Sequence, residues 1–141
     1  MADACDFADC SERLLAMTTR KRFPKKVLEP LRAGKMLGIR AGAEHKFIWI
    51  WVVVVEGRVF VRSWSLKPRS WYWTFQEEPR GTIVVDGREI AVRAVQTRSE
   101  RLKKAVDEAY LSKYNTPGSI KYAKDLGRKK SRDTTTELVP V

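Results

Sequence analysis

The sequence has few of the residues that bind metals or form covalent cross-links. Its 141 residues include two cysteines and one histidine, His45, which are too few ligands for a zinc site. Cys5 and Cys10 lie so close together that a disulfide between them would close a very small loop and anchor nothing else. The sequence therefore predicts free thiols in a reducing cytoplasm and no metal site.

Long apolar segments are also missing. The longest apolar run, residues 47–55, has nine residues, whereas a membrane-spanning helix needs about 20. The first sixteen residues carry four acidic side chains, unlike a secretory signal or an Arg-rich transit peptide. Translation can start at Met1 or at Met17, and we assign no function to the residues before Met17. We expect a cytoplasmic protein without a membrane partner, with an N-terminal extension (residues 1–20) and one domain (residues 21–141).

Basic residues outnumber acidic residues in the rest of the chain. The formal net charge is +11, and because residues 1–16 contribute −3, the remainder carries +14. Such an excess attracts anionic partners, among which nucleic acids, phosphate-bearing cofactors and acidic metabolites all qualify. The cations are scattered from Lys21 to Arg132 rather than gathered on one helix. We therefore expect any nucleic-acid binding to be weak and non-specific.

The hydrophobic pattern predicts a mainly β, α+β domain. Two hairpins are expected, 47–55 with 58–64 through Glu56-Gly57, and 81–85 with 88–95 through Asp86-Gly87. Further strands are predicted at 36–40 and 133–139, and helices at 24–33, at 70–77 and from Ser99 to about Asn115. Hairpin turns are too short for the crossovers of a parallel sheet. Closing the sheet removes exposed edges, so we predict a six-stranded antiparallel barrel.

The end of the strand predicted at 58–64 and the loop that follows it form the segment most informative for function. Hydroxyl and cationic side chains follow one another just before a predicted helix, a combination that suits a phosphate: Arg62, Ser63, Ser65 and Lys67. A solvated basic loop is the alternative. Since side chains alternate along a strand, we expect Val59 and Val61 to fill the barrel and Arg62 to lie on the outer face, open to a ligand or partner. Trp71 either packs in the core or stacks on a flat ring.

This segment resembles the phosphate-binding strands of flavin-reductase-like split barrels, which include the pyridoxamine-phosphate-oxidase-like and deazaflavin-dependent reductase families. In these, an apolar strand ends in a Ser/Thr and Lys/Arg loop, followed by a helix with an aromatic residue and a proline break, here Trp71 and Pro79. The chain from about residue 24 to 140 also resembles an uncharacterised bacterial family of unknown function. The shared features are Trp49-x-Trp51, the valine run, Gly57, Val-Arg-Ser, Trp71-Tyr72, a Thr-rich last strand and the helix end Ala109, Tyr110, Lys113 and Tyr114.

The resemblance implies a homodimeric split β-barrel that binds FMN or a deazaflavin at the subunit interface. Arg62, Ser63, Ser65, Lys67 and Trp71 would then contact the cofactor, while Arg93 either contributes or points to solvent. The chain departs from the pattern in having no clear second phosphate-binding arginine upstream. The cofactor would supply hydride chemistry, as in an oxidoreductase acting on an unknown small molecule. The alternative is a non-enzymatic binding module for nucleic acid or another anionic ligand.

No catalytic side chain is assigned from the sequence. His45 lies in a polar turn beside Glu44 and Lys46, where it is either a surface residue or a base. We recognise no pairing of a nucleophile with a base, so a hydrolase is not expected. No role is assigned to the basic stretch 121–132.

Overall fold

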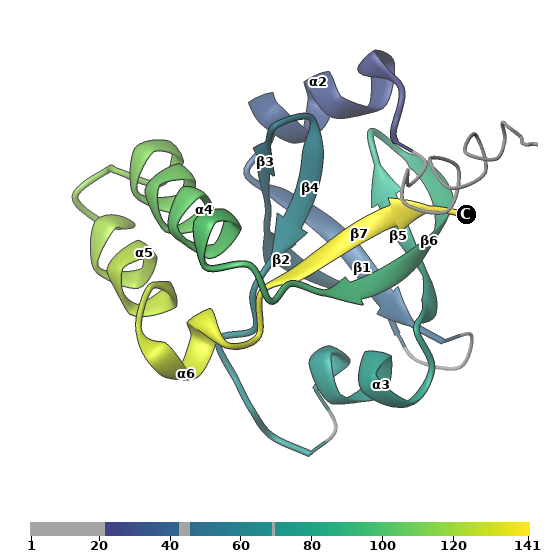
Figure 1. Cartoon of the computed structure of the whole chain (residues 1–141). Coiled ribbons are helices and arrows are strands. Elements are labelled where there is room, and N and C mark those ends of the chain that lie inside the picture. Colours follow the sequence, from purple (N-terminus) through teal and green to yellow (C-terminus); the bar gives the residue numbers. More distant parts are fainter. Residues whose placement is uncertain (1–21, 43–45, 69) are drawn as a thin grey trace, which may run out of the picture.

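Seven strands form one antiparallel sheet in the computed structural model of the chain, which describes residues 22–42, 46–68 and 70–141 (Figure 1). In spatial order they run β2-β1-β5-β6-β7-β4-β3. Their bounds are β1 (Met36–Ala41), β2 (Ile48–Trp51), β3 (Val53–Val55), β4 (Arg58–Val61), β5 (Arg80–Val85), β6 (Arg88–Gln96) and β7 (Thr136–Pro140). The last of these in the chain, β7, pairs with β6 on one side and with β4 on the other.

The two edge strands of this order are halves of one bent strand. Only Val52 separates β2 from β3 in the chain, yet β2 pairs with β1 and β3 pairs with β4. The bent strand thus joins the two edges, and the sheet curls into a nearly closed barrel. The predicted mainly β, antiparallel, barrel-like fold is confirmed, with the strand expected at 47–55 divided into two.

The two tight hairpins form where the sequence predicts them. Glu56 and Gly57 connect β3 to β4, and Asp86 and Gly87 connect β5 to β6. All four residues have positive φ, between 52° and 76°. Positive φ at both central residues is typical of the type I′ turn, whose twist matches that of the flanking strands.

Five helices surround the barrel in the described part of the chain: α2 (Lys25–Ala33), α3 (Trp71–Glu77), α4 (Glu100–Lys113), α5 (Ile120–Leu126) and α6 (Lys129–Arg132). The first three were predicted; α4 begins after Ser99, whose hydroxyl accepts a hydrogen bond from the Leu102 N–H at 3.2 Å. The basic stretch 121–132 folds into α5 and α6, which were not predicted. Figure 1 shows α4, α5 and α6 together on one side of the barrel.

Side chains of β4 alternate between two hydrophobic clusters. Val59 and Val61 face the barrel interior with residues from β1, β5, α2 and α3, as predicted. Phe60 faces outward and packs with α4 residues that include Val106 and Tyr110. The outer face of β4 is therefore covered by α4 and is closed to solvent.

The bend between β2 and β3 is held by the end of α4. The Val52 N–H donates to the Tyr114 hydroxyl at 3.0 Å, and the Val52 carbonyl accepts from the Lys113 ammonium at 2.8 Å. The Tyr114 ring stacks on Trp51 with centroids 4.0 Å apart. Because Val52 has no strand partner and is fully buried, these side chains satisfy backbone groups that the sheet leaves unpaired.

Candidate binding cleft

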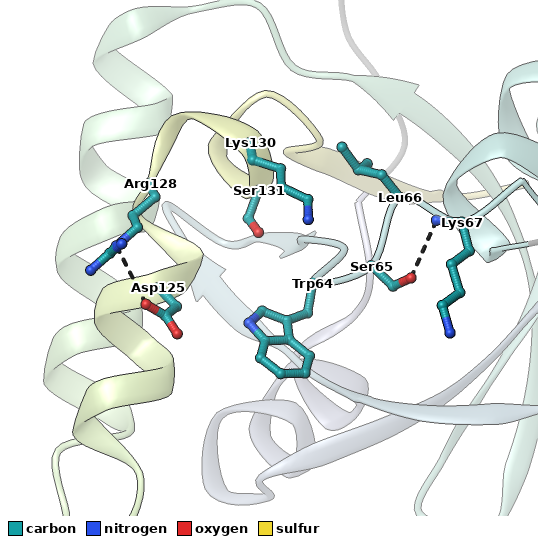
Figure 2. A pocket seen from close by; sticks show the side chains of 8 residues that line it. All are labelled: Trp64, Ser65, Leu66, Lys67, Asp125, Arg128, Lys130 and Ser131. Atoms are coloured by element: carbon teal, nitrogen blue, oxygen red, sulfur yellow. Dashed lines mark hydrogen bonds and ion pairs between the residues drawn. The ribbon is translucent and has the colours of Figure 1, made fainter.

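The chain that leaves β4 forms one wall of a cleft, and α5 and α6 form the other (Figure 2). Its volume is about 740 Å³. The lining residues are Trp64, Ser65, Leu66, Lys67, Asp125, Arg128, Lys130 and Ser131. The two walls come from segments about 60 residues apart in the sequence, which the packing of α4 and α5 against each other and against the barrel brings together.

Positive charge dominates the lining of this cleft. Three cations face one carboxylate, and that carboxylate, Asp125, already pairs with Arg128 at 3.4 Å. The ammonium groups of Lys67 and Lys130 have no acidic partner within the residues that the structure describes. Two uncompensated cations beside the hydroxyls of Ser65 and Ser131 make the cleft suitable for an anion such as a phosphate.

Aromatic side chains continue the cleft on the far side of Trp64. A second cavity of about 330 Å³ is lined by Met36, Trp49, Ile50, Trp51, Arg62, Trp64, Trp71, Tyr122 and Leu126. Trp64 is 60% exposed and Trp49 is 56% exposed, and the rings of Trp64 and Tyr122 meet edge to face at 5.9 Å. Exposed aromatic groups gathered in this way are a common feature of binding surfaces.

The expectation that Arg62 is an exposed cation is wrong. It lies on the outer face of β4 as the alternation predicted, but α4 and α5 cover that face and its side chain is 0% exposed. Its Nη1 donates to Asp107 Oδ1 at 2.6 Å and to the Leu126 carbonyl at 2.9 Å. Burial lowers the pKa of Arg62, and the carboxylate of Asp107 opposes that shift. The guanidinium is thus engaged inside the protein.

Arg62 instead ties one wall of the cleft to the barrel. Its other nitrogens donate to Thr135 Oγ1 at 2.8 Å and to the Lys103 carbonyl at 3.0 Å. Asp107 also accepts from Arg132 at 3.0 Å. One buried cation therefore connects β4 with α4, with the end of α5 and with the segment before β7.

The other predicted site residues fall into three groups. Ser65 and Lys67 line the cationic cleft. Ser63 and Trp71 are buried, Ser63 donating through its hydroxyl to the Ser65 carbonyl and Trp71 forming part of the aromatic cavity. Arg93 is exposed on β6, opposite Arg80 and Val139, and lines neither cavity. His45, Cys5 and Cys10 lie outside the described residues.

Sequence reasoning missed the contribution of α5 and α6. Lys130 and Tyr122 belong to the basic stretch 121–132, to which the sequence assigned no role, yet Ala123 and Leu126 on α5 are buried. Apolar residues spaced by three, at positions 120, 123 and 126, are the signal that predicts a short amphipathic helix here.

Neither a metal-binding cluster nor a membrane-spanning helix is found in the part of the chain that the structure describes. No three side chains of the types that ligate metals come together there. Nor is any of its helices long and apolar enough to cross a membrane.

Comparisons with known proteins identify the fold and the family. The crystal structure of the conserved hypothetical protein Rv2991 from Mycobacterium tuberculosis matches with a TM-score of 0.56 at 12% identity, covering 87% of this chain and 85% of that one. Similarity at this level of identity establishes the fold alone. No curated protein sequence matches. A family profile described as "Uncharacterized protein conserved in bacteria (DUF2255)" matches residues 38–138, a range that includes both walls of the cleft.

Proposed function

The chain belongs to the DUF2255 family, and we propose that it binds a phosphate-bearing flavin or deazaflavin in this cleft. The observation that carries the proposal is the position of Trp64, which lines both the cationic cleft and the aromatic cavity. A ligand lying across Trp64 has cations at one end and aromatic rings at the other. FMN and phosphorylated deazaflavins carry a phosphate and a flat ring at opposite ends in the same way.

The donor set fits such a cofactor. Lys67 and Lys130 supply cations for the phosphate, with Ser65 as a hydroxyl donor. Trp64, Trp49 and Tyr122 supply ring faces and edges for an aromatic system. Both cavities fall within the size range of small-molecule sites, about 300–1,000 Å³.

The bound cofactor would supply hydride transfer, and the chain would supply binding and orientation. Buried Trp71 and half-buried Ile50 line the aromatic cavity and would shield a ring bound there from water. The activity supported is that of an oxidoreductase acting on a small molecule.

A homodimer is part of the same proposal. Large apolar side chains stay exposed around the aromatic cavity, among them Met36, Trp49, Trp64 and Tyr122. A second copy would cover this surface and shield the ring from solvent. Light scattering at micromolar protein concentration should give a dimer mass, and a monomer mass would count against this part.

The test compares FMN with riboflavin, which lacks the phosphate. Each charge-assisted contact contributes about 1.5–3 kcal/mol, so Lys67→Ala and Lys130→Ala should each weaken FMN binding about tenfold to a hundredfold. Riboflavin affinity should hardly change. Trp64→Ala should weaken both ligands, whereas Arg93→Ala, on a cation outside the cleft, is the matched control. Quenching of flavin fluorescence gives the affinities, and a phosphorylated deazaflavin with its dephosphorylated analogue is measured in the same way.

A second candidate, binding of single-stranded nucleic acid, rests on the exposed cations beyond the cleft. Lys121, Lys124 and Lys129 are exposed on α5 and α6, and the Lys121 ammonium lies 5.0 Å from the centre of the Tyr122 ring. Bases can stack on such aromatic groups while lysines bind the backbone. Submicromolar binding of an oligonucleotide at physiological salt, with no binding of any flavin or deazaflavin, would replace the cofactor proposal by this one.

A further inference from the structure

A third cavity adjoins the cleft and shares part of its lining with the proposed cofactor site. Its volume is about 540 Å³. It shares Ser65 and Lys67 with the cationic cleft, and Ile50 and Trp71 with the aromatic cavity. The remaining lining residues are Ile39, Ala41, Lys46, Ile48 and Ser70. Because the two cavities share Ile50 and Trp71 as lining, a molecule in this cavity would lie next to a ring held in the aromatic cavity.

The lining combines an apolar surface with two cations and no carboxylate. Five of its side chains are apolar, contributed by β1, β2 and the start of α3. Lys46 and Lys67 are its charged residues. An apolar body would be buried against the isoleucines and Trp71, while a negative group would pair with the lysines.

Ser70 provides an independent indication of a missing polar partner. Its hydroxyl oxygen is buried and has no hydrogen-bond partner among the described residues, although the residue precedes α3 at the position of an N-cap. A buried hydroxyl without a partner costs free energy. Since Ser70 lines this cavity, an anionic oxygen bound there is a candidate partner for the hydroxyl.

We propose that this cavity binds an apolar carboxylic acid, with its chain against Ile39, Ile48 and Ile50 and its carboxylate between Lys46 and Lys67. The proposed binding of the acid depends only on the residues that line this cavity. Its role as the substrate of an oxidoreductase rests on the proposed function above, because the cofactor ring would lie in the neighbouring cavity.

Isoleucine methyl NMR tests the site directly. The sequence has six isoleucines, and three of them line the cavity, so Ile39, Ile48 and Ile50 report on it while Ile120, on α5, serves as an internal control. Titration of δ1-methyl-labelled protein with octanoate should shift the three cavity signals and leave Ile120 unchanged. Octanoate should bind at least about tenfold more tightly than 1-octanol, because only the acid gains a charge-assisted contact.

A matched pair of lysine variants tests the carboxylate. Lys46→Ala should remove most of the preference for octanoate over octanol while octanol still binds. Lys104→Ala, at an exposed lysine of α4 outside the cavity, should keep the preference. Equal affinities for acid and alcohol in the unmodified protein would overturn the proposed ligand class. The absence of shifts at Ile39 and Ile48 at millimolar octanoate would overturn the site.

The same spectra separate this inference from the cofactor proposal. FMN should shift Ile50, which also lines the aromatic cavity, and should leave Ile39 and Ile48 unchanged. Octanoate binding without FMN binding would support the acid site and remove the cofactor. FMN binding without octanoate binding would support the cofactor site and overturn the acid site.

Discussion

Replacing Tyr114 with phenylalanine removes one oxygen atom from the point where the bent strand passes between the two edges of the sheet. The Val52 N–H donates to that oxygen at 3.0 Å, and Val52 is fully buried. The phenyl ring that remains can still stack on Trp51. The substitution therefore separates the hydrogen bonds of the hydroxyl from the packing of the ring.

The expected loss follows from the amide that is left unpaired. A buried N–H without a partner costs about 1–3 kcal/mol. The Val52 carbonyl keeps the Lys113 ammonium at 2.8 Å, whereas the Lys35 carbonyl loses the hydroxyl as its donor. We expect the free energy of unfolding of Tyr114→Phe to fall by about 1–3 kcal/mol, which lowers Tm by about 2–4 °C for each kcal/mol in a domain of this size.

Urea unfolding followed by circular dichroism measures this loss, and hydrogen exchange locates it. The amide of Val52 should lose protection in Tyr114→Phe. Tyr122→Phe is the matched control, because that ring is exposed and no hydrogen bond of its hydroxyl occurs among the described residues. It should stay within about 0.5 kcal/mol of the unmodified protein. Equal losses in the two variants, with unchanged exchange at Val52, would refute the role of the hydroxyl in closing the barrel.

Three further predictions concern stability. Asp107→Ala should cost about 3–5 kcal/mol because it leaves the fully buried guanidinium of Arg62 without its carboxylate, whereas Asp125→Ala, whose partner Arg128 is exposed, should cost at most about 1 kcal/mol in the same urea titration. Gly81→Ala should cost about 1–3 kcal/mol, since a Cβ there would collide with a backbone carbonyl of β1 and an aromatic ring of α3, while Gly118→Ala, with open space around it, should leave Tm unchanged. Burial lowers the pKa of Lys113 to about 8, whereas a lysine in the unfolded chain has a pKa of about 10.4. Between these two pH values the unfolded chain binds more protons than the folded protein, so the free energy of unfolding should rise between about pH 8 and pH 10. A Lys113→Met variant that kept the same rise would contradict this assignment.

Local signals were sufficient to predict the elements that depend on neighbours in the sequence. The turns at Glu56-Gly57 and Asp86-Gly87 require positive φ at both residues, and each pair contains a glycine and an acidic residue that tolerate it. The helix after Ser99 was found from its cap and its apolar stripe. These features need no knowledge of the rest of the chain.

The bend at Val52 could not be located in this way. Residues 47–55 are apolar throughout, so no periodicity marks where the strand turns from one neighbour to the other. The groups that fix the bend, Lys113 and Tyr114, lie 61 and 62 residues further along. Only the docking of α4 shows which peptide they bind.

The burial of Arg62 escaped prediction for the same reason. The alternation of side chains along β4 gave the correct face, but the cover of that face comes from other elements. Asp107 and the Leu126 carbonyl lie 45 and 64 residues away in the sequence. Lys130 lines the cleft through the same docking of helices, whereas Ser65 and Lys67 lie within six residues of the end of β4 and could be grouped from the sequence.

The central place of β7 between β6 and β4 has a consequence for biosynthesis. Of the strands in the described chain, β7 is the last to be translated, so the ribosome makes both of its partners first. Until Thr136–Pro140 emerges, β4 and β6 each present a row of unpaired N–H and C=O groups to the surrounding solvent. Open edges of this kind are templates for pairing with other nascent chains. A polypeptide released before Thr136 keeps both edges open, and it is the species that chaperones would have to hold.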